Sequence, residues 1–127
     1  MDPLVDAAVS ARENARASFS GFRVGAAIED AEGRLHTGCN IENATLGLTV
    51  CAERVALFKA LSEGVRTFRR IAIATDSETL TPPCGACRQL LWEFCGDVEV
   101  ILANLRGKTE SLRLKDLFPR PFDASSL

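Results

Sequence analysis

RRIAIATD, residues 69–76, is the stretch that decides the fold. Its centre is a continuous apolar run rather than an alternation of apolar and polar side chains. A strand of this kind suits the middle of a sheet that is covered on both faces, because neither of its own faces can be left in water. We therefore predict a central strand here, with helices on both sides of the sheet.

The segments that flank this strand have the pattern of helices. The apolar pattern over residues 51–63 predicts a helix that ends at Gly64, and residues 84–95 predict a second helix that ends at Gly96. The other predicted elements are a helix over residues 3–17 capped by Asp2, strands over residues 22–29, 35–39 and 98–102, a short strand over 111–114, and a helical turn before the tail. Strands joined through helices imply right-handed crossovers. We predict an α/β protein, a three-layer α/β/α sandwich with a mixed, mostly parallel sheet of about five strands, in a single domain of residues 1–127.

The composition excludes several classes of function. The chain has 127 residues and a net charge of −2, which argues against a basic surface that grips nucleic acid. We expect no signal peptide, because charges interrupt the first fifteen residues, and no apolar run approaches the ~20 residues of a membrane span. We therefore expect a cytoplasmic protein that binds neither nucleic acid nor membrane. In a reducing compartment its five cysteines favour free thiols or metal ligands over disulfides.

Three cysteines and a glutamate form the candidate site. In CGAC, Cys84 and Cys87 are three residues apart at a helix start, so both sulfurs point the same way and the helix dipole favours thiolates. Cys51 also lies at a helix start. If the two helix starts converge, three thiolates meet, and three protein ligands with an open fourth position are typical of a catalytic zinc site. Glu53 can then exchange protons with water that the metal activates.

Arginines near the cysteines would balance the charge of such a site. Three thiolates on Zn²⁺ leave a net charge of −1, which makes the metal a weaker Lewis acid. Arg54, and Arg88 directly after Cys87, are candidates to donate hydrogen bonds to sulfur and offset this charge.

Two other interpretations of the cysteines remain open at this point. CGAC alone is also typical of a redox dithiol pair, although such a pair needs neither a third thiol nor an acid. A structural zinc site needs a fourth protein ligand, which His36, Cys39 or Cys95 could supply.

The motifs together resemble a known family. CAE (residues 51–53) and PCGAC (residues 83–87) match the zinc deaminase signature, with cysteine in the histidine position. The chain resembles the small, homotetrameric cytidine deaminases of nucleoside salvage over nearly its whole length. The matching segments are FSGFRVGAA (19–27), GCNIENA (38–44), CAERVALFKALSEG (51–64), PCGACRQ (83–89) and LFPRPF (117–122).

This resemblance implies a role for each matching residue. One zinc ion per subunit would be held by Cys51, Cys84 and Cys87, with Glu53 as the proton shuttle and Arg54 bonded to the thiolates. The implied substrate contacts are Phe22 in the base pocket, the backbone of Ala52 at the base carbonyl, Asn40 and Glu42 at a ribose hydroxyl, and Phe122 reaching into a neighbouring subunit of a homotetramer with shared active sites.

The chain departs from the family at two aromatic positions. It has no tyrosine, whereas the family commonly has one where Phe19 stands and another where Leu46 stands. Phe19 keeps the ring and loses a hydroxyl, while Leu46 is the larger change and bears on subunit packing and on the width of the pocket.

The predicted function is hydrolytic deamination of cytidine and 2′-deoxycytidine to uridine and 2′-deoxyuridine. A single contact to the ribose would not distinguish the two sugars. The alternatives are a deaminase of a modified cytosine nucleoside such as blasticidin S, and a non-catalytic structural zinc module.

Overall fold

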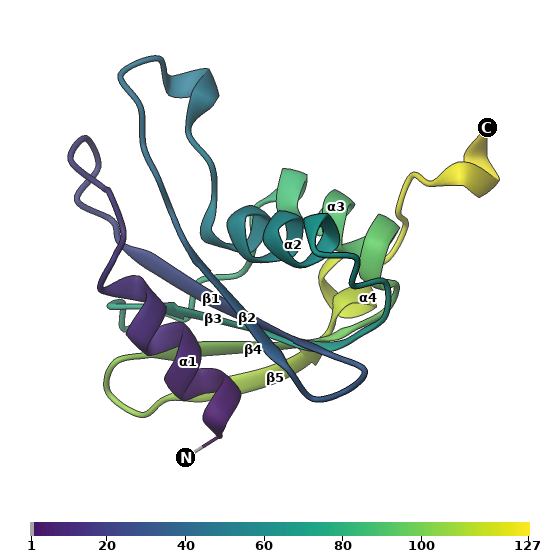
Figure 1. Cartoon of the computed structure of the whole chain (residues 1–127), viewed down its shortest axis with the longest axis horizontal. Coiled ribbons are helices and arrows are strands. Elements are labelled where there is room, and N and C mark those ends of the chain that lie inside the picture. Colours follow the sequence, from purple (N-terminus) through teal and green to yellow (C-terminus); the bar gives the residue numbers. More distant parts are fainter. Residues whose placement is uncertain (1) are drawn as a thin grey trace.

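The computed structural model describes residues 2–127, and over these residues the strands form one five-stranded sheet. The strands are β1 (Val24–Asp30), β2 (Leu35–Cys39), β3 (Phe68–Thr75), β4 (Glu99–Asn104) and β5 (Thr109–Arg113). Their order across the sheet is β2-β1-β3-β4-β5, so β3 is the central strand (Figure 1). The prediction for residues 69–76 is therefore confirmed.

The sheet is mixed, as predicted, but it is not mostly parallel. Within the described residues β3 and β4 are the one parallel pair, while β1–β2, β1–β3 and β4–β5 are antiparallel. Helix α2 (Ala52–Ser62) does connect two strands of the same direction, β2 and β3, but β1 lies between them and runs the opposite way. Because β1 lies between these two strands, they form two antiparallel pairs with it instead of one parallel pair with each other.

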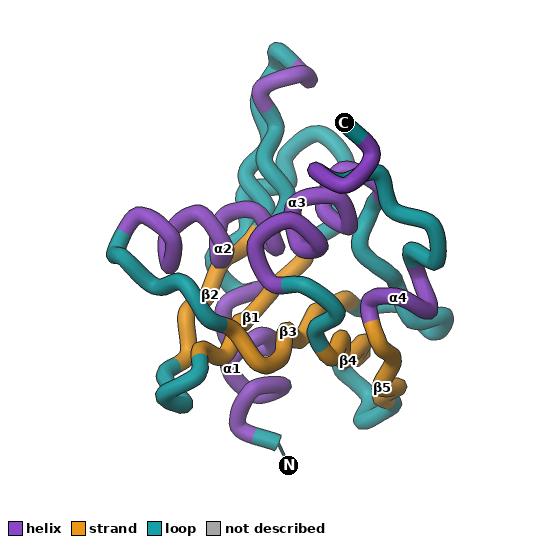
Figure 2. The backbone as a smooth tube through the Cα atoms, turned by 90° about the vertical axis from the view of Figure 1, so that its right-hand side faces the viewer, coloured by secondary structure: helices purple, strands orange, loops and turns teal. Residues whose placement is uncertain are grey.

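Helices cover both faces of the sheet, which confirms the α/β/α arrangement. Helix α1 (Pro3–Arg12) lies on one face, and α2 and α3 (Gly85–Cys95) lie side by side on the other (Figures 1 and 2). Each face has its own buried apolar cluster. Sites built at the ends of α2 and α3 therefore share one face of the sheet.

The alternating sizes in β3 explain how the two faces are packed. Ile71 and Ile73 point into the larger core under α2 and α3, whereas Ala72 and Ala74 point toward α1. The small side chains let α1 approach closely. Gly25 on β1 completes this face, because a Cβ there would lie 2.0 Å from the carbonyl oxygen of Ala8.

Helix α1 begins as predicted and ends earlier. The Asp2 carboxylate accepts a hydrogen bond from the Leu4 amide at 2.9 Å, which is the expected N-cap. The helix stops at Arg12 rather than at residue 17, because the backbone of Arg16 bonds to the loop after β2: its amide donates to Asn40 and its carbonyl accepts from Glu42. These long-range bonds replace the last predicted helical turn.

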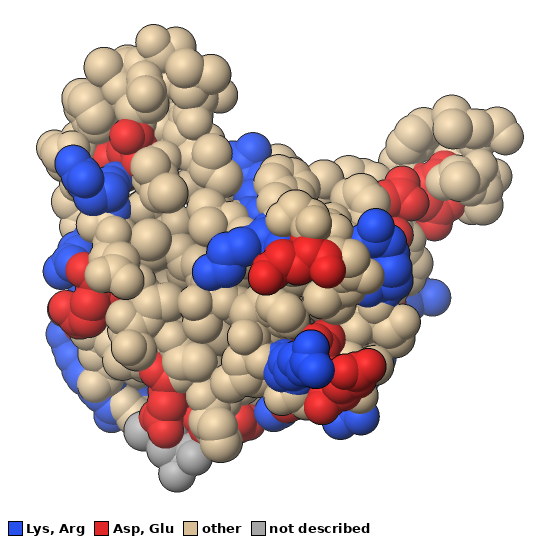
Figure 3. Space-filling model, viewed as in Figure 1, with Lys and Arg blue, Asp and Glu red and all other residues tan. Residues whose placement is uncertain are grey.

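Two segments project from the layered body. One is the loop of residues 40–50, which carries the short helix η1 (Leu46–Leu48), and the other is the tail after α4 (Leu114–Leu117), which ends in η2 (Ala124–Ser126) (Figure 1). In the face shown in Figure 3, acidic and basic side chains are interspersed over the body, and the ends of both projections carry little charge. Across the part of the chain that the structure describes, no helix has the length and apolarity needed to cross a bilayer.

Candidate metal centre and active site

The first turns of α2 and α3 converge on the same point of the molecule. Cys51 is the N-cap of α2, Cys84 is the N-cap of α3, and Cys87 lies one turn into α3. Close packing of α2 on the sheet requires Gly38, since a Cβ there would lie 2.6 Å from the Ala52 carbonyl oxygen. The predicted convergence of the two helix starts is therefore found.

The three sulfur atoms have the spacing of zinc ligands. The Sγ–Sγ distance is 3.9 Å between Cys51 and Cys84 and 3.5 Å between Cys84 and Cys87, and all three atoms lie within 4.8 Å of one another. Zn–S bonds of about 2.3 Å at tetrahedral angles place two sulfurs about 3.8 Å apart. The donor set and its spacing fit one zinc ion.

The charges of the cluster also favour a cation. Hydrogen bonds from the thiol of Cys87 and from Arg54 lower the pKa of Cys51 to about 5. The same hydrogen bond to the Cys51 thiolate raises the pKa of Cys87, because it stabilises the protonated thiol that donates it, and burial acts in the same direction. The protein alone thus stabilises the Cys51 thiolate, and a divalent cation would compensate the charge of the cluster once all three sulfurs bind it.

Arg54 donates a hydrogen bond to one sulfur of the cluster. Its Nη2 donates to the Thr49 carbonyl at 3.2 Å and to the Cys51 sulfur at 3.5 Å. The expectation for Arg88 is wrong, because its guanidinium instead donates to the carbonyls of Pro83 and Leu117, both at 2.8 Å. Arg88 therefore holds the chain that leads into Cys84 rather than a sulfur.

None of the candidate fourth ligands reaches the three sulfurs in residues 2–127. His36 bonds to Asp30 at 2.9 Å, at the far end of β1. Cys95 ends α3, and burial raises its pKa to about 12, so its thiol stays protonated. Cys39 also lies outside the cluster. A closed four-ligand structural site is not formed by these residues.

Glu53 lies beside the sulfurs and is shielded from water. It is 6% exposed, and burial, assisted by the charge of the Cys51 thiolate, raises its pKa to about 7. Three thiolates and a zinc ion would also carry a net negative charge, which acts in the same direction. A carboxyl group with a pKa near neutrality can both accept and donate a proton.

A cavity of about 190 Å³ opens at Glu53 and two of the cysteines. Four of the predicted site residues form its wall in addition to the metal cluster: Phe22, Asn40, Ala52 and Glu53. The wall also includes residues that we did not predict, namely Val24, Thr49, Ile73, Thr81 and Pro82. Thr81 and Pro82 directly precede PCGAC, a signal that could have identified them, whereas Val24 and Ile73 depend on how β1 pairs with β3.

Asn40 has a structural role as well as its place in the cavity wall. Its Oδ1 accepts from the Val24 amide at 2.9 Å, and its Nδ2 donates to the Phe22 carbonyl at 2.8 Å. The side chain therefore fixes the start of β1. One amide hydrogen and one oxygen lone pair remain for a ligand.

Two predicted substrate contacts lie away from this cavity wall. The Glu42 carboxylate accepts from the amides of Phe19 and Ser20, at 2.9 and 3.0 Å, and from the Ser20 hydroxyl. These bonds, led by that of the Ser20 hydroxyl, lower the pKa of Glu42 and keep it ionised. Phe122 lies on the projecting tail with 60% of its surface exposed.

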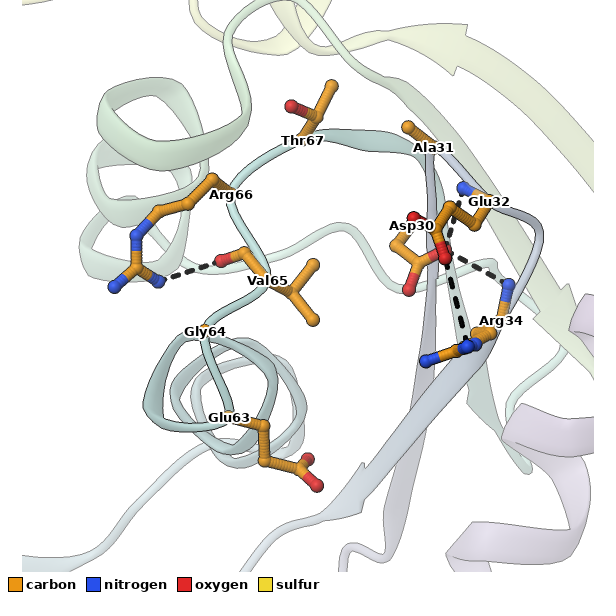
Figure 4. A pocket seen from close by; sticks show the side chains of 9 residues that line it. All are labelled: Asp30, Ala31, Glu32, Arg34, Glu63, Gly64, Val65, Arg66 and Thr67. Atoms are coloured by element: carbon orange, nitrogen blue, oxygen red, sulfur yellow. Dashed lines mark hydrogen bonds and ion pairs between the residues drawn. The ribbon is translucent and has the colours of Figure 1, made fainter.

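A larger cavity, of about 330 Å³, lies at the opposite end of β1 (Figure 4). Its charged walls are already engaged: Asp30 accepts from the amides of Glu32 and Arg34, and Arg66 donates to the carbonyls of Leu61 and Val65. This cavity contains none of the cysteines, so its size does not make it the site of the chemistry.

Comparison with known proteins gives a consistent result. Residues 2–104 match the family described as the cytidine and deoxycytidylate deaminase zinc-binding region. A cytidine deaminase from Sporosarcina psychrophila is 44% identical over 128 residues, which cover 100% of this chain and 94% of that protein. The crystal structure of cytidine deaminase from Burkholderia pseudomallei superposes with a TM-score of 0.92 and 43% identity, over 96% of this chain and 100% of that one. A blasticidin-S deaminase from Bacillus cereus is less similar, at 31% identity over 104 residues, or 76% of this chain and 74% of that protein.

Proposed function

Because the chain belongs to the cytidine and deoxycytidylate deaminase zinc-binding family, we propose that it hydrolyses cytidine and 2′-deoxycytidine to uridine and 2′-deoxyuridine and releases ammonia. The observation that carries the proposal is the buried Glu53 beside three convergent thiols at the wall of a cavity. Residues 1–127 act as one deaminase domain.

The cofactor is one zinc ion, held by the sulfurs of Cys51, Cys84 and Cys87. When bound, zinc supplies the Lewis acidity that makes water a nucleophile at neutral pH. Arg54 holds the Cys51 thiolate in place and offsets part of the charge of the cluster. With three protein ligands the fourth coordination position stays open, as catalysis requires.

Glu53 moves the protons of the reaction. It accepts one proton of the water that attacks C4 of the cytosine and delivers this proton to N3 of the base. It then accepts the proton of the new hydroxyl on C4 and delivers it to the amino group, which leaves as ammonia as the C4 carbonyl forms. Its raised pKa suits this use, because a group that titrates near neutrality can take up and release a proton in one cycle. Burial also excludes bulk water that would compete for the proton.

The nucleoside is held at both of its ends. Phe22 and the backbone of Ala52 contact the base, and both lie in the cavity wall. Asn40 and Glu42 bind a ribose hydroxyl, Asn40 with the amide hydrogen that its bond to Phe22 leaves free. Since this contact does not depend on the 2′-hydroxyl, both the ribonucleoside and the deoxyribonucleoside are substrates.

The active form is a homotetramer whose sites are shared through the tail. Leu46 and Leu48 are 72% and 64% exposed on the projecting loop, and Phe122 is exposed on the tail. Apolar side chains gathered on projections are typical of protein interfaces. The Phe122 ring enters the site of a neighbouring subunit and stacks on its substrate. The five free thiols suit a reducing cytoplasm.

Substrate identity is tested by assaying the zinc-loaded protein with cytidine and blasticidin S in competition. Cytidine should be converted faster, since the ribose-binding loop has no matching group on the antibiotic, and preferential conversion of blasticidin S would contradict the proposal.

Sharing of sites is tested by mixing two impaired variants, Glu53→Gln and Phe122→Ala, and assaying the mixture at a cytidine concentration well below KM. In mixed oligomers, a subunit with intact Glu53 can receive Phe122 from its neighbour, so part of the activity should return. If no activity returns although the subunits exchange, the tail does not complete a neighbouring site.

A further inference from the structure

The C-terminal tail is attached to helix α3 at two successive residues. The Gln89 side chain donates from Nε2 to the carbonyl of Phe122 at 2.8 Å, and the indole Nε1 of Trp92 donates to Oδ2 of Asp123 at 3.0 Å. Gln89 and Trp92 are three residues apart and therefore lie on the same side of α3. The first bond holds the backbone of Phe122, and the second holds the side chain of the next residue.

Both partners of the indole bond are themselves fixed. Trp92 is half-buried and packs against the core under α2 and α3, so its N–H group has a defined position. Asp123 caps η2, with Oδ1 accepting from the Ser125 amide at 2.9 Å and Oδ2 accepting from the indole. The bonds from Ser125 and from Trp92 lower the pKa of Asp123, so the acceptor stays charged.

The attachment does not serve to bury Phe122 in its own subunit. The Phe122 ring is 60% exposed, although Gln89 binds the backbone carbonyl of this residue and the next residue, Asp123, caps η2. A single exposed apolar side chain is common on protein surfaces and does not by itself indicate a partner. An exposed ring on a restrained backbone instead presents a fixed apolar surface to a second molecule.

We propose that Trp92 and Gln89 are positioning residues for the reaction: they hold the tail so that Phe122 reaches the active site of a second copy of this chain in a fixed orientation. This inference rests on the proposed sharing of active sites. A free tail would lose conformational entropy each time its ring stacked on a substrate, and a tail already ordered by α3 avoids that cost. The benefit should therefore be in nucleoside binding rather than in the chemical step.

The test is the variant Trp92→Phe, which keeps an aromatic side chain against the core and removes the N–H donor together with part of the ring volume. We expect KM for cytidine to rise roughly threefold to tenfold, the range for one lost hydrogen bond, with kcat within about twofold of wild type. Zinc content and oligomeric state should not change. Glu93→Gln, an exposed neighbour on the same helix, is the matched control and should behave as wild type.

A double-variant cycle links the effect to Phe122. Phe122→Leu alone should raise KM, and adding Trp92→Phe to it should raise KM no further, because the indole acts only through the ring. If Phe122→Leu raises KM and Trp92→Phe does not, the tether is refuted while shared sites stand. If Phe122→Leu leaves KM unchanged, sharing through the tail is itself refuted.

A second variant approaches the same bond from the exposed side. Asp123→Ala removes the acceptor without touching the core, and it should reproduce the rise in KM even if Trp92→Phe folds poorly. Trp92 is the single tryptophan of the chain, so its fluorescence reports directly on this contact. Asp123→Ala should shift the emission, and a rise in KM without such a shift would contradict the proposed role of the indole.

Discussion

Substituting Gly38 by alanine should displace the helix start that carries Cys51 and Glu53. Gly38 lies on β2 under the first turn of α2, where an added Cβ would lie 2.5 Å from the Ala56 amide nitrogen and 2.6 Å from the Ala52 carbonyl oxygen. Both are backbone atoms of one helix and cannot rotate away. The helix as a whole must move.

The size of this movement follows from the distances. Ordinary contacts of a Cβ begin at 3.4 Å, so relief of the 2.5 Å contact requires a separation of about 0.9 Å (3.4 − 2.5). Metal–ligand distances tolerate only about ±0.2 Å. Overpacking of this kind costs about 3 kcal/mol, which corresponds to a fall in Tm on the order of 10 °C for a domain of this size. Zinc affinity should fall as well, because α2 moves relative to Cys84 and Cys87.

The matched control is Gly25→Ala, which creates an even closer backbone contact, 2.0 Å from the Ala8 carbonyl oxygen, on the other face of the sheet. Both variants should lose stability in thermal unfolding. Only Gly38→Ala should also lose zinc in titrations with a competing chelator and lose cytidine deamination beyond its loss of folded protein. If the folded Gly38→Ala protein retains wild-type zinc affinity, or if Gly25→Ala weakens zinc binding equally, the packing argument is wrong.

Three further predictions concern charged groups. Arg54→Gln should raise the pKa of Cys51, so that zinc is released at a higher pH than in wild type when zinc retention is measured against pH. If both proteins release zinc at the same pH, Arg54 does not stabilise the Cys51 thiolate. Ser20→Ala should raise KM for cytidine a few-fold at constant kcat in steady-state kinetics, because Glu42 loses the hydroxyl that orients its carboxylate. An unchanged KM would show that this hydrogen bond does not contribute to nucleoside binding. Asp30→Asn should lower Tm at pH 7. The hydrogen bond from His36, the only histidine, lowers the pKa of Asp30 in the folded state, so the ionised carboxylate stabilises the fold at pH values above the ordinary pKa of 3.8. The difference in Tm between variant and wild type should shrink as the pH falls below 3.8, and a difference that stays constant would refute this linkage.

The parts of the fold that depend on local pattern were predictable. The unbroken apolar centre of residues 69–76 indicated a strand buried on both faces, and β3 is the central strand. Helix ends at Gly64 and Gly96 were marked by the glycines themselves, and both have positive φ angles, 93° and 71°.

The parts that depend on long-range pairing were not predictable from the pattern. Nothing in the sequence of β1 indicates that it lies between β2 and β3, and this placement makes most of the strand pairs antiparallel. The early end of α1 has the same origin, since the competing partners of Arg16 lie in the loop after β2. Strand periodicity predicts which face of the sheet a side chain occupies, but it does not identify the strand that pairs with it.

In the candidate site, too, the features set by local spacing were predictable and those set by long-range contacts were not. The spacing of Cys84 and Cys87, and the placement of Cys51 at a helix start, were enough to predict one cluster, and the sulfurs lie together. The bonds of Arg88 to two carbonyls could not be foreseen, because one of its partners, Leu117, is distant in the sequence. The tether between Trp92 and the tail escaped prediction for the same reason.

The central claim is that Glu53 carries the protons of a zinc-dependent cytidine deamination. The most direct measurement is the fall in ultraviolet absorbance on cytidine deamination by the purified protein and by its Glu53→Gln variant, with zinc content determined for both. The account predicts turnover in the wild type and a loss of at least about 10²- to 10⁴-fold in the variant, with one zinc ion per subunit retained. A zinc-loaded, folded wild type that leaves cytidine unchanged, or a variant that retains its activity, would contradict it.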